Sequence, residues 1–336
     1  MTRALITGAA GFIGSHVADE CLRLGMEVVA TDSLSGGFFD NVPADVTWVE
    51  GDISDPDFVE SLWESRAYDF VYHTAAYAAE GLSHFIRAYN YRTNLQASVL
   101  LLNQSVLHGV RRFVFTSSIA VYGAEQTPMT EEMTPRPEDP YGISKYAVEL
   151  DLAAANDIFG LEYTIFRPHN VYGERQNISD PYRNVIGIFM SAVLRGEPMP
   201  VFGDGLQTRA FSHIDDVAPM IARSPLVDGA RNEVINVGAD QPYTILELAD
   251  AVARAFGVER EVVYLPARHE VVHAFCAHEK ARRIFDISSS IGLEEGIARM
   301  ARWVKDVGVR PPTPFPGEIE VPMGMPPSWA EMITAT

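Results

Sequence analysis

The sequence predicts an α/β protein built on a doubly wound parallel sheet, with a smaller lobe in its second half. The chain opens with the strand-like run Arg3–Thr7, a glycine-rich turn and the helix-like stretch Ser15–Leu24. Apolar strand-like runs then alternate with helical stretches, which is typical of a parallel sheet covered by helices on both faces. Past the middle of the chain this rhythm loosens, which indicates a second lobe that is partly interleaved with the sheet.

The predicted elements follow in order, and each is bounded by a turn signal or by a change of period. Further strands are expected at Glu27–Thr31, Val46–Glu50, Asp69–His73, Arg112–Thr116 and Glu162–Phe166. Further helices are expected at Ser83–His108, Tyr141–Phe159, Ile245–Phe256 and Gly292–Val307. Residues 1–168 would then form the sheet domain. Residues 169–336 would form most of the second lobe and a Pro-rich tail that wraps the surface without regular structure.

Composition and charge exclude several classes of protein. Of the 336 residues, 47% are hydrophobic and 21% charged, as in ordinary globular proteins. The net charge of −19 argues against nucleic acid or an anionic membrane surface as a partner. Two cysteines are too few for a disulfide framework, and no metal-ligand motif occurs among the histidines. With no run long enough to span a membrane, the sequence predicts a cytoplasmic protein without a metal site.

The turn between the first strand and the first helix, GAAGFIG from Gly8 to Gly14, has the spacing of a dinucleotide-binding Rossmann fold. One glycine permits the tight turn, one allows the backbone to approach a pyrophosphate, and one lets the helix pack closely on the strand. The second strand-like run leads to Asp32, near the distance at which an acid binds the adenosine ribose. Because a carboxylate there repels a 2′-phosphate, the sequence predicts NAD rather than NADP.

A second pattern, YGISK at 141–145, carries the predicted chemistry. Tyr141 and Lys145 are four residues apart and so share a face of the predicted helix. A tyrosine acts as a base near neutral pH only if its pKa falls from about 10, and an adjacent ammonium favours the phenolate. Ser118, just beyond the run Arg112–Thr116, could share the hydrogen bond to a substrate. These three residues are the predicted catalytic group.

Together these motifs resemble those of the extended short-chain dehydrogenases/reductases, and within them the nucleotide-sugar epimerases and dehydratases. The resemblance covers nearly the whole chain and includes TSSIAVYG at 116–123 and RPHNVYG at 167–173. In the site that it implies for NAD, Lys145 would contact the nicotinamide ribose, Pro168 would lie beside the nicotinamide and Asn94 would support the cofactor loop. The implied cofactor residues are Gly8, Gly11, Phe12, Ile13, Gly14, Asp32, Asp52, Ile53, Ala75, Asn94, Tyr141, Lys145 and Pro168.

The resemblance also implies a nucleotide-sugar site formed largely by the second lobe. Its residues would be Ser118, Asn170, Asn184, Val185, Phe202, Arg209 and Arg268. Of these, Arg209 and Arg268 would bind the diphosphate and Phe202 would pack on the base. Two local arginines suit a diphosphate even in an acidic protein, because bidentate donors act at short range. His278 lies in a segment that departs from the family pattern, and it is interpreted as structural rather than catalytic.

The expected reaction follows from residues that this chain lacks. Enzymes of the resembling group oxidise the sugar C4 hydroxyl, with tyrosine as base and NAD⁺ as hydride acceptor. The dehydratases among them read Thr-Asp-Glu where this chain has Ser118, Ile119 and Ala120, and the decarboxylases carry a Glu at the last of these positions, so this chain has no carboxylate there. Without an acid and base for elimination, return of the hydride to the opposite face is the remaining outcome. We therefore predict a 4-epimerase that acts on UDP-glucose and UDP-galactose.

Two alternatives stay open at this point. One is an epimerase of another nucleotide sugar, such as UDP-glucuronate, a UDP-N-acetylhexosamine, or a GDP- or dTDP-sugar. Asn177 stands where resembling enzymes for UDP-glucuronate carry arginine, which favours a neutral hexose, but Arg183 lies nearby as a substitute cation. The other alternative is a catalytically inactive nucleotide-binding regulator, which would have no need for the intact catalytic group.

The same resemblance implies a homodimer. The helices expected at Ser83–His108 and Tyr141–Phe159 would pair with those of a second copy in a four-helix bundle. The apolar residues Leu95, Val99 and Leu102 would lie at that interface or, alternatively, in the core of one subunit.

Overall fold

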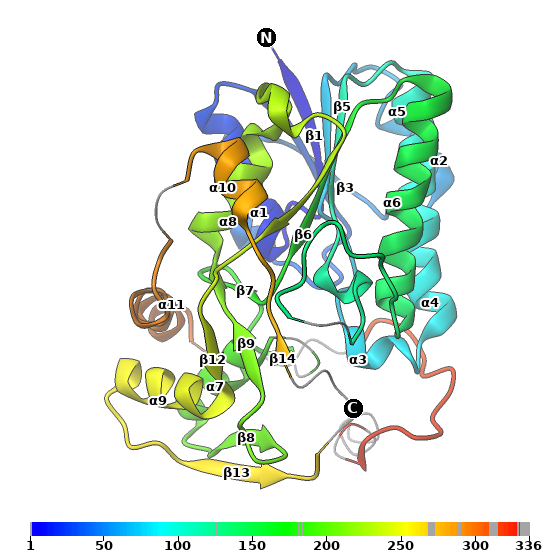
Figure 1. Ribbon diagram of the computed structural model, residues 1–336. Coiled ribbons are helices and arrows are strands. Elements are labelled where there is room, and N and C mark those ends of the chain that lie inside the picture. Colours follow the sequence, from blue (N-terminus) through cyan, green and yellow to red (C-terminus); the bar gives the residue numbers. More distant parts are fainter. Residues whose placement is uncertain are drawn as a thin grey trace.

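A seven-stranded parallel sheet in the order β11-β6-β5-β4-β1-β2-β3 forms the centre of the molecule (Figure 1). Its strands are β1 (Arg3–Thr7), β2 (Glu27–Asp32), β3 (Thr47–Glu50), β4 (Phe70–His73), β5 (Arg112–Thr116), β6 (Tyr163–Pro168) and β11 (Glu233–Val237). This computed structural model describes residues 2–124, 127–180, 182, 184–267, 273–287, 290–308, 315–327 and 329. The doubly wound α/β fold predicted from the sequence is confirmed.

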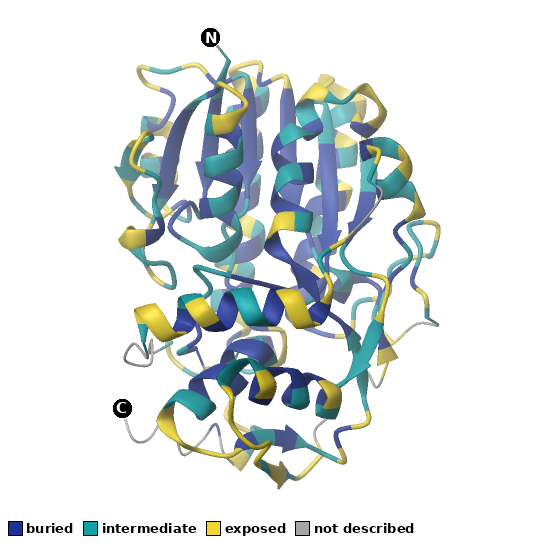
Figure 2. Cartoon of the chain, turned by 90° about the vertical axis from the view of Figure 1, so that its left-hand side faces the viewer, coloured by how far each residue is buried: buried dark blue, intermediate teal, exposed yellow. Residues whose placement is uncertain are grey.

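Both faces of the sheet are covered by helices, and the central strands are apolar on both sides for that reason. In β1, Ala4 and Ile6 belong to one core while Leu5 between them belongs to the other, as the period of two requires. Figure 2 shows the strands buried and the helices exposed on their outer faces. The first core contains α1 (Phe12–Arg23), α8 (Ile214–Arg223) and α10 (Glu279–Phe285), and the second contains α2 (Pro56–Ser61), α5 (Ala97–Leu107) and α6 (Pro140–Phe159).

The order of the strands reverses at β1, and this reversal indicates at which end of the sheet a ligand site is expected. From β1 the chain adds β2 and β3 on one side, and β4, β5 and β6 on the other. Neighbouring crossovers therefore leave in opposite directions at the carboxyl ends of β1 and β4. In open α/β sheets a crevice for ligands forms at such a switch point.

The second lobe has a core of its own, formed by α7 (Val185–Arg195), α9 (Ile245–Phe256) and α11 (Leu293–Val307). The bounds of α9 agree with the prediction because both ends carry local signals. Thr244 and Glu247 form a capping box at its start, and Gly257 ends it in a left-handed conformation. Short sheets complete the lobe: β7 (Val171–Tyr172) with β10 (Ser212–His213), β8 (Met199–Phe202) with β13 (Val262–Leu265), and β9 (Thr208–Ala210) between β12 (Pro242–Thr244) and β14 (His273–Ala274).

Several elements differ from the prediction, and the helices α2, α7, α8 and α10 were not expected. The stretch expected as one helix, Ser83–His108, contains instead α4 (Arg87–Tyr91), a π-helical turn at Arg92–Gln96 and α5, and a separate short helix, α3 (Glu80–Ser83), precedes it. The backbone opens between α3 and α4, where Ile86 is not helical. In addition, β11 was not expected, although it comes from the second half of the chain and completes the sheet beside β6.

The described part of the C-terminal tail returns to the sheet domain. The backbone N–H groups of Glu320 and Val321 donate to the carbonyl oxygen of Phe85, between α3 and α4, at 2.8 and 3.2 Å. In Figure 1 this red segment runs close to those two helices. Across the ranges that the structure describes, no helix combines the length and the apolar character needed to cross a bilayer.

Candidate active site

A cavity of about 850 Å³ lies at the carboxyl ends of the strands, within the usual size range of ligand sites. Its lining includes these residues predicted from the sequence: Gly8, Gly11, Phe12, Ile13, Gly14, Asp32, Asp52, Ile53, Ala75, Ser118, Tyr141, Lys145, Pro168, Asn170, Asn184, Val185, Phe202 and Arg209. Asn94 is not among the described lining residues, and Arg268 lies outside the described part of the chain. The cavity thus brings both halves of the chain together.

Glycines shape the turn that follows β1. Gly8 has a φ of +71°, a conformation that favours glycine. A Cβ on Gly14 would lie 2.1 Å from the carbonyl oxygen of Gly8, so α1 can pack against the turn only without a side chain there. The N-cap of α1 is Gly11, which supplies no side-chain hydrogen bond to the helix. The first N–H groups of α1 can therefore bind a pyrophosphate.

The Asp32 carboxylate lies at the end of β2, against this turn. One oxygen accepts from the N–H of Ala10 at 3.1 Å and the other from the N–H of Leu34 at 2.8 Å. Burial raises the pKa of Asp32, and these backbone hydrogen bonds oppose the rise. The carboxylate is thus held in a fixed orientation at the cavity wall, where a ribose diol could donate to it.

The loop after β4 is held from behind by Asn94. Its amide oxygen accepts from the N–H of Tyr77 at 2.8 Å, and its amide nitrogen donates to the Tyr77 carbonyl oxygen at 3.1 Å. The loop passes close to the glycine turn: a Cβ on Gly8 would lie 2.7 Å from the Ala75 backbone. Asn94 is therefore placed to support the loop rather than to touch a ligand in the cavity.

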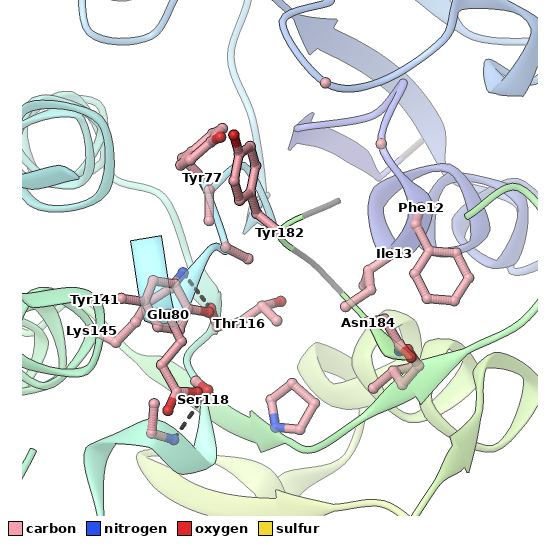
Figure 3. A pocket seen from close by; sticks show the side chains of 18 of the residues that line it. Phe12, Ile13, Tyr77, Glu80, Thr116, Ser118, Tyr141, Lys145, Tyr182 and Asn184 are labelled. Carbon is pink, nitrogen blue, oxygen red and sulfur yellow. Dashed lines mark hydrogen bonds between the residues drawn. The ribbon is translucent and has the colours of Figure 1, made fainter. Parts of the chain in front are cut away.

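The predicted catalytic group comes together on one wall of the cavity, opposite Phe12 and Ile13 (Figure 3). Tyr141 lies in the first turn of α6, whose N-cap Asp139 accepts from the N–H of Gly142. The Lys145 ammonium nitrogen lies one turn later, 5.8 Å from the centre of the Tyr141 ring. Ser118 follows β5, and its hydroxyl accepts from the N–H of Ala120 at 3.1 Å.

Lys145 is buried, and that burial determines its charge. Its ammonium donates to the carbonyl oxygen of Thr116 at 2.9 Å. Burial lowers the pKa of Lys145 to about 7, although Glu149 one turn later opposes the change. Lys145 therefore titrates near neutral pH, and a phenolate on Tyr141 would favour its charged form.

On the substrate side, several predicted residues are fixed by their own hydrogen bonds. The Asn184 side chain caps α7 by accepting from Ile186, and it donates to the Val171 carbonyl oxygen at 2.7 Å. Asn170, with a φ of +41°, donates to the Ala210 carbonyl oxygen at 3.2 Å. Arg209 lies on β9 at the cavity wall. This set can offer amide donors and one guanidinium to a diphosphate.

The cavity lining also contains residues that the sequence analysis did not predict, and Glu80 and Trp329 are two of them. Glu80 on α3 is exposed in the cavity, and in Figure 3 it extends toward Ser118. Trp329, close to the C-terminus, is buried in the wall on the same side. No local motif marks either residue, because each reaches the cavity through contacts between distant parts of the chain.

A buried pair of histidines borders the same cavity. His169 lines it, and its Nε2 lies 3.0 Å from Nε2 of His278. The other nitrogen of His278 lies 2.7 Å from a carboxylate oxygen of Asp240. Burial, and then His278, lowers the pKa of His169 to about 3, so His169 is neutral at physiological pH. His278 is not among the described lining residues, and its structural role stays a prediction.

Comparison with known proteins identifies the family. The model of the NAD dependent epimerase/dehydratase family matches residues 4–238. This chain belongs to that family. It is 33% identical to the UDP-glucose 4-epimerase of Mycolicibacterium smegmatis, over 90% of this chain and 99% of that protein.

Solved structures of the family agree with this assignment. One is UDP-glucose 4-epimerase with UDP-glucose from Thermotoga maritima, with 33% identity, a TM-score of 0.85, and coverage of 91% of this chain and 99% of that chain. Another is the Thermus thermophilus UDP-glucose 4-epimerase in complex with NAD, with 31% identity, a TM-score of 0.84, and coverage of 90% and 99%. The predicted cofactor, NAD, is confirmed for this family, and the glycine turn and uncapped α1 fit it. Within the described ranges, no three His, Cys, Asp or Glu side chains gather as a metal site.

Replacing Asp32 with alanine should narrow the preference of this family member for NAD over NADP by about tenfold or more. The change removes a charged acceptor for the ribose, and such hydrogen bonds contribute about 1.5–3 kcal/mol. It also removes a charge that would repel the 2′-phosphate. Competition titrations with NAD and NADP measure the two affinities. Asp45→Ala, an exposed acid outside the lining, is the control, and equal affinity of the unaltered protein for both nucleotides would contradict the assignment.

Proposed function

We propose that this protein is a nucleotide-sugar 4-epimerase that interconverts UDP-glucose and UDP-galactose. The observation that carries the proposal is the grouping of Tyr141, Lys145 and Ser118 on one wall of a cavity that also contains the glycine turn. Tyr141 would accept the proton of the C4 hydroxyl while Ser118 hydrogen-bonds the same oxygen. Lys145 would stabilise the phenolate. NAD⁺, when bound beside them, would supply a reversible acceptor for the C4 hydride.

Epimerisation requires that the 4-keto sugar present its other face before reduction. Elimination would need an acid and a base beside Ser118, and Ile119 and Ala120 supply neither. Glu80 is a carboxylate of the cavity lining that extends toward Ser118 in Figure 3, and it keeps a dehydratase as the second candidate. Formation of a 4-keto-6-deoxy sugar by the wild-type protein would select that candidate.

The acidic groups of the cavity favour a neutral sugar. Glu80 and Asp139 both line it on the side of Tyr141, and each would repel a sugar carboxylate. The amide of Asn177 accepts from the N–H of Ser179 at 3.1 Å and offers no cationic fork to a carboxylate. Arg183, the alternative cation, lies outside the described residues.

Steady-state assays with UDP-glucose, UDP-galactose and UDP-glucuronate test the proposal directly. We expect interconversion of the two neutral sugars, with kcat/KM at least about tenfold higher than for the glucuronate, since one charge-assisted contact contributes about 1.5–3 kcal/mol. A small amount of NADH absorbance should appear when sugar is added. A preference for glucuronate would reassign the sugar and make Arg183→Ala the next variant. Absence of both turnover and NADH would indicate a nucleotide-binding regulator instead.

We also propose that the enzyme is a homodimer. Apolar side chains remain exposed on the outer faces of α5 and α6, namely Leu107, Ile143, Leu150, Ile158 and Phe159. Burying them against a second copy would remove apolar surface from water. Of the residues considered beforehand, Leu102 is instead buried within one subunit, and Leu95 and Val99 are half-buried. The cytoplasmic location stays a prediction.

A further inference from the structure

The C-terminal tail is docked on the sheet domain by a specific set of hydrogen bonds. The two carboxylate oxygens of Glu320 accept from the N–H groups of Ala88 and Tyr89 at 2.7 and 2.8 Å, in the first turn of α4. The tail backbone adds the two bonds to Phe85 described above. Because the first N–H groups of a helix have no partner within it, Glu320 satisfies donors that would otherwise need water.

Beyond this contact the tail brings Trp329 into the cavity wall. Its ring lies 5.4 Å from that of Tyr182, edge to face, and 6.4 Å from that of Phe85. A Cβ on Gly81 would lie only 2.9 Å from the indole, so the ring packs directly on the backbone of α3. The side chain is only 6% exposed, yet it contributes to the cavity lining together with Gly324 and Pro326.

The same turn of α3 is joined to the catalytic tyrosine. The Ser83 hydroxyl accepts from the backbone N–H of Tyr141 at 3.2 Å and donates to the Glu80 carbonyl oxygen at 2.6 Å. α3 therefore links the two residues: Trp329 packs on its Gly81, and its Ser83 bonds the backbone of Tyr141. Asp32 and Asp52, which mark the adenosine end, belong instead to the ends of β2 and β3.

We propose that Trp329 is a specificity-determining residue for the sugar, and that the tail residues 315–327 position it. This inference rests on the proposed function, because it takes the ligand at Tyr141 to be the sugar of a nucleotide sugar. An indole can pack against the C–H groups of a pyranose and exclude water from them. The nucleotide would be bound elsewhere, by Phe202 and Arg209 of the second lobe. Trp329 thus acts on the sugar and leaves the nucleotide unaffected.

Calorimetric titration with UDP-glucose, and with UDP as its control, tests the inference on the NAD-loaded protein. In Trp329→Ala we expect binding of UDP-glucose to weaken about tenfold while binding of UDP is unchanged. Trp329→Phe should restore most of the affinity, because it keeps an aromatic ring. Glu320→Ala lies outside the cavity and should weaken UDP-glucose binding in the same direction by releasing the tail.

Met323→Ala is the matched control, because this residue lies on the same tail and is 80% exposed. Thermal unfolding of each variant verifies that the fold is retained. Unchanged affinity of Trp329→Ala for UDP-glucose would overturn the inference, and so would an equal loss for UDP-glucose and UDP. If the wild-type protein bound UDP-glucose no more tightly than UDP, that result would overturn the inference as well. Failure of the proposed function can be distinguished from failure of this inference, because it appears as absence of turnover in the wild-type protein.

Discussion

Tyr141→Phe should lower turnover at least about 100-fold while the fold and NAD binding are retained, because removal of a general base typically costs 10²- to 10⁴-fold. The substitution deletes only the hydroxyl that would take the C4 proton. Lys145 would remain on its carbonyl partner Thr116, since that hydrogen bond does not involve the tyrosine. The interconversion of UDP-glucose and UDP-galactose measures turnover, and the nucleotide content of the purified variant measures NAD binding.

Tyr146→Phe provides a control on the same helix. Tyr146 is half-buried in an apolar cluster with Tyr122 and Met129, and it is not itself among the described lining residues of the cavity. Loss of its hydroxyl should leave turnover within a factor of about two, since it meets no reacting atom. Near-normal turnover of Tyr141→Phe would contradict the assignment of the base, whatever the control shows.

The parts of the site that could be predicted are those encoded by short spacings. The turn from Gly8 to Gly14 follows a strand and begins a helix, so its glycines have defined positions as soon as those elements are recognised. Tyr141 and Lys145 share a face because the helix repeats every 3.6 residues. Asp32 follows from the same logic, since it ends the strand next to β1. The positions of the glycine turn, of the Tyr141–Lys145 pair and of Asp32 thus all follow from local geometry.

The parts that could not be predicted depend on contacts between distant segments. Trp329 reaches Gly81 from the far end of the chain, and His169 meets His278 across 109 positions. Glu80 lies just before the helix expected from Ser83, on the short helix α3, which was not expected and which brings Glu80 to the cavity. In each case only the folded chain brings the groups together, so no pattern of nearby residues marks them.

A buried ion pair close to Lys145 is the feature whose loss should destabilise the protein most. Glu149 and Arg167 each have side chains only 4% exposed, and Nε of Arg167 donates to Oε1 of Glu149 at 3.0 Å. Ser117 also donates to Glu149, and Arg167 donates to the Tyr122 hydroxyl at 2.8 Å. Burial opposes the charge of Arg167, but its contacts with Glu149 outweigh burial and raise its pKa.

Glu149→Leu should lower the free energy of unfolding by about 3–5 kcal/mol, because it leaves the Arg167 guanidinium buried without a counter-charge. Arg167→Met should cost a similar amount by leaving the carboxylate unpaired. The double variant should lose much less than the sum of the two, since apolar side chains can replace a buried pair at small cost. Denaturant unfolding of the four proteins measures the coupling, with surface Glu197→Leu as the control for the substitution. Additive losses in the double variant would show that the two charges do not depend on each other. Glu149→Leu also removes the carboxylate that favours the charged form of Lys145, so the pKa of Lys145 should fall further.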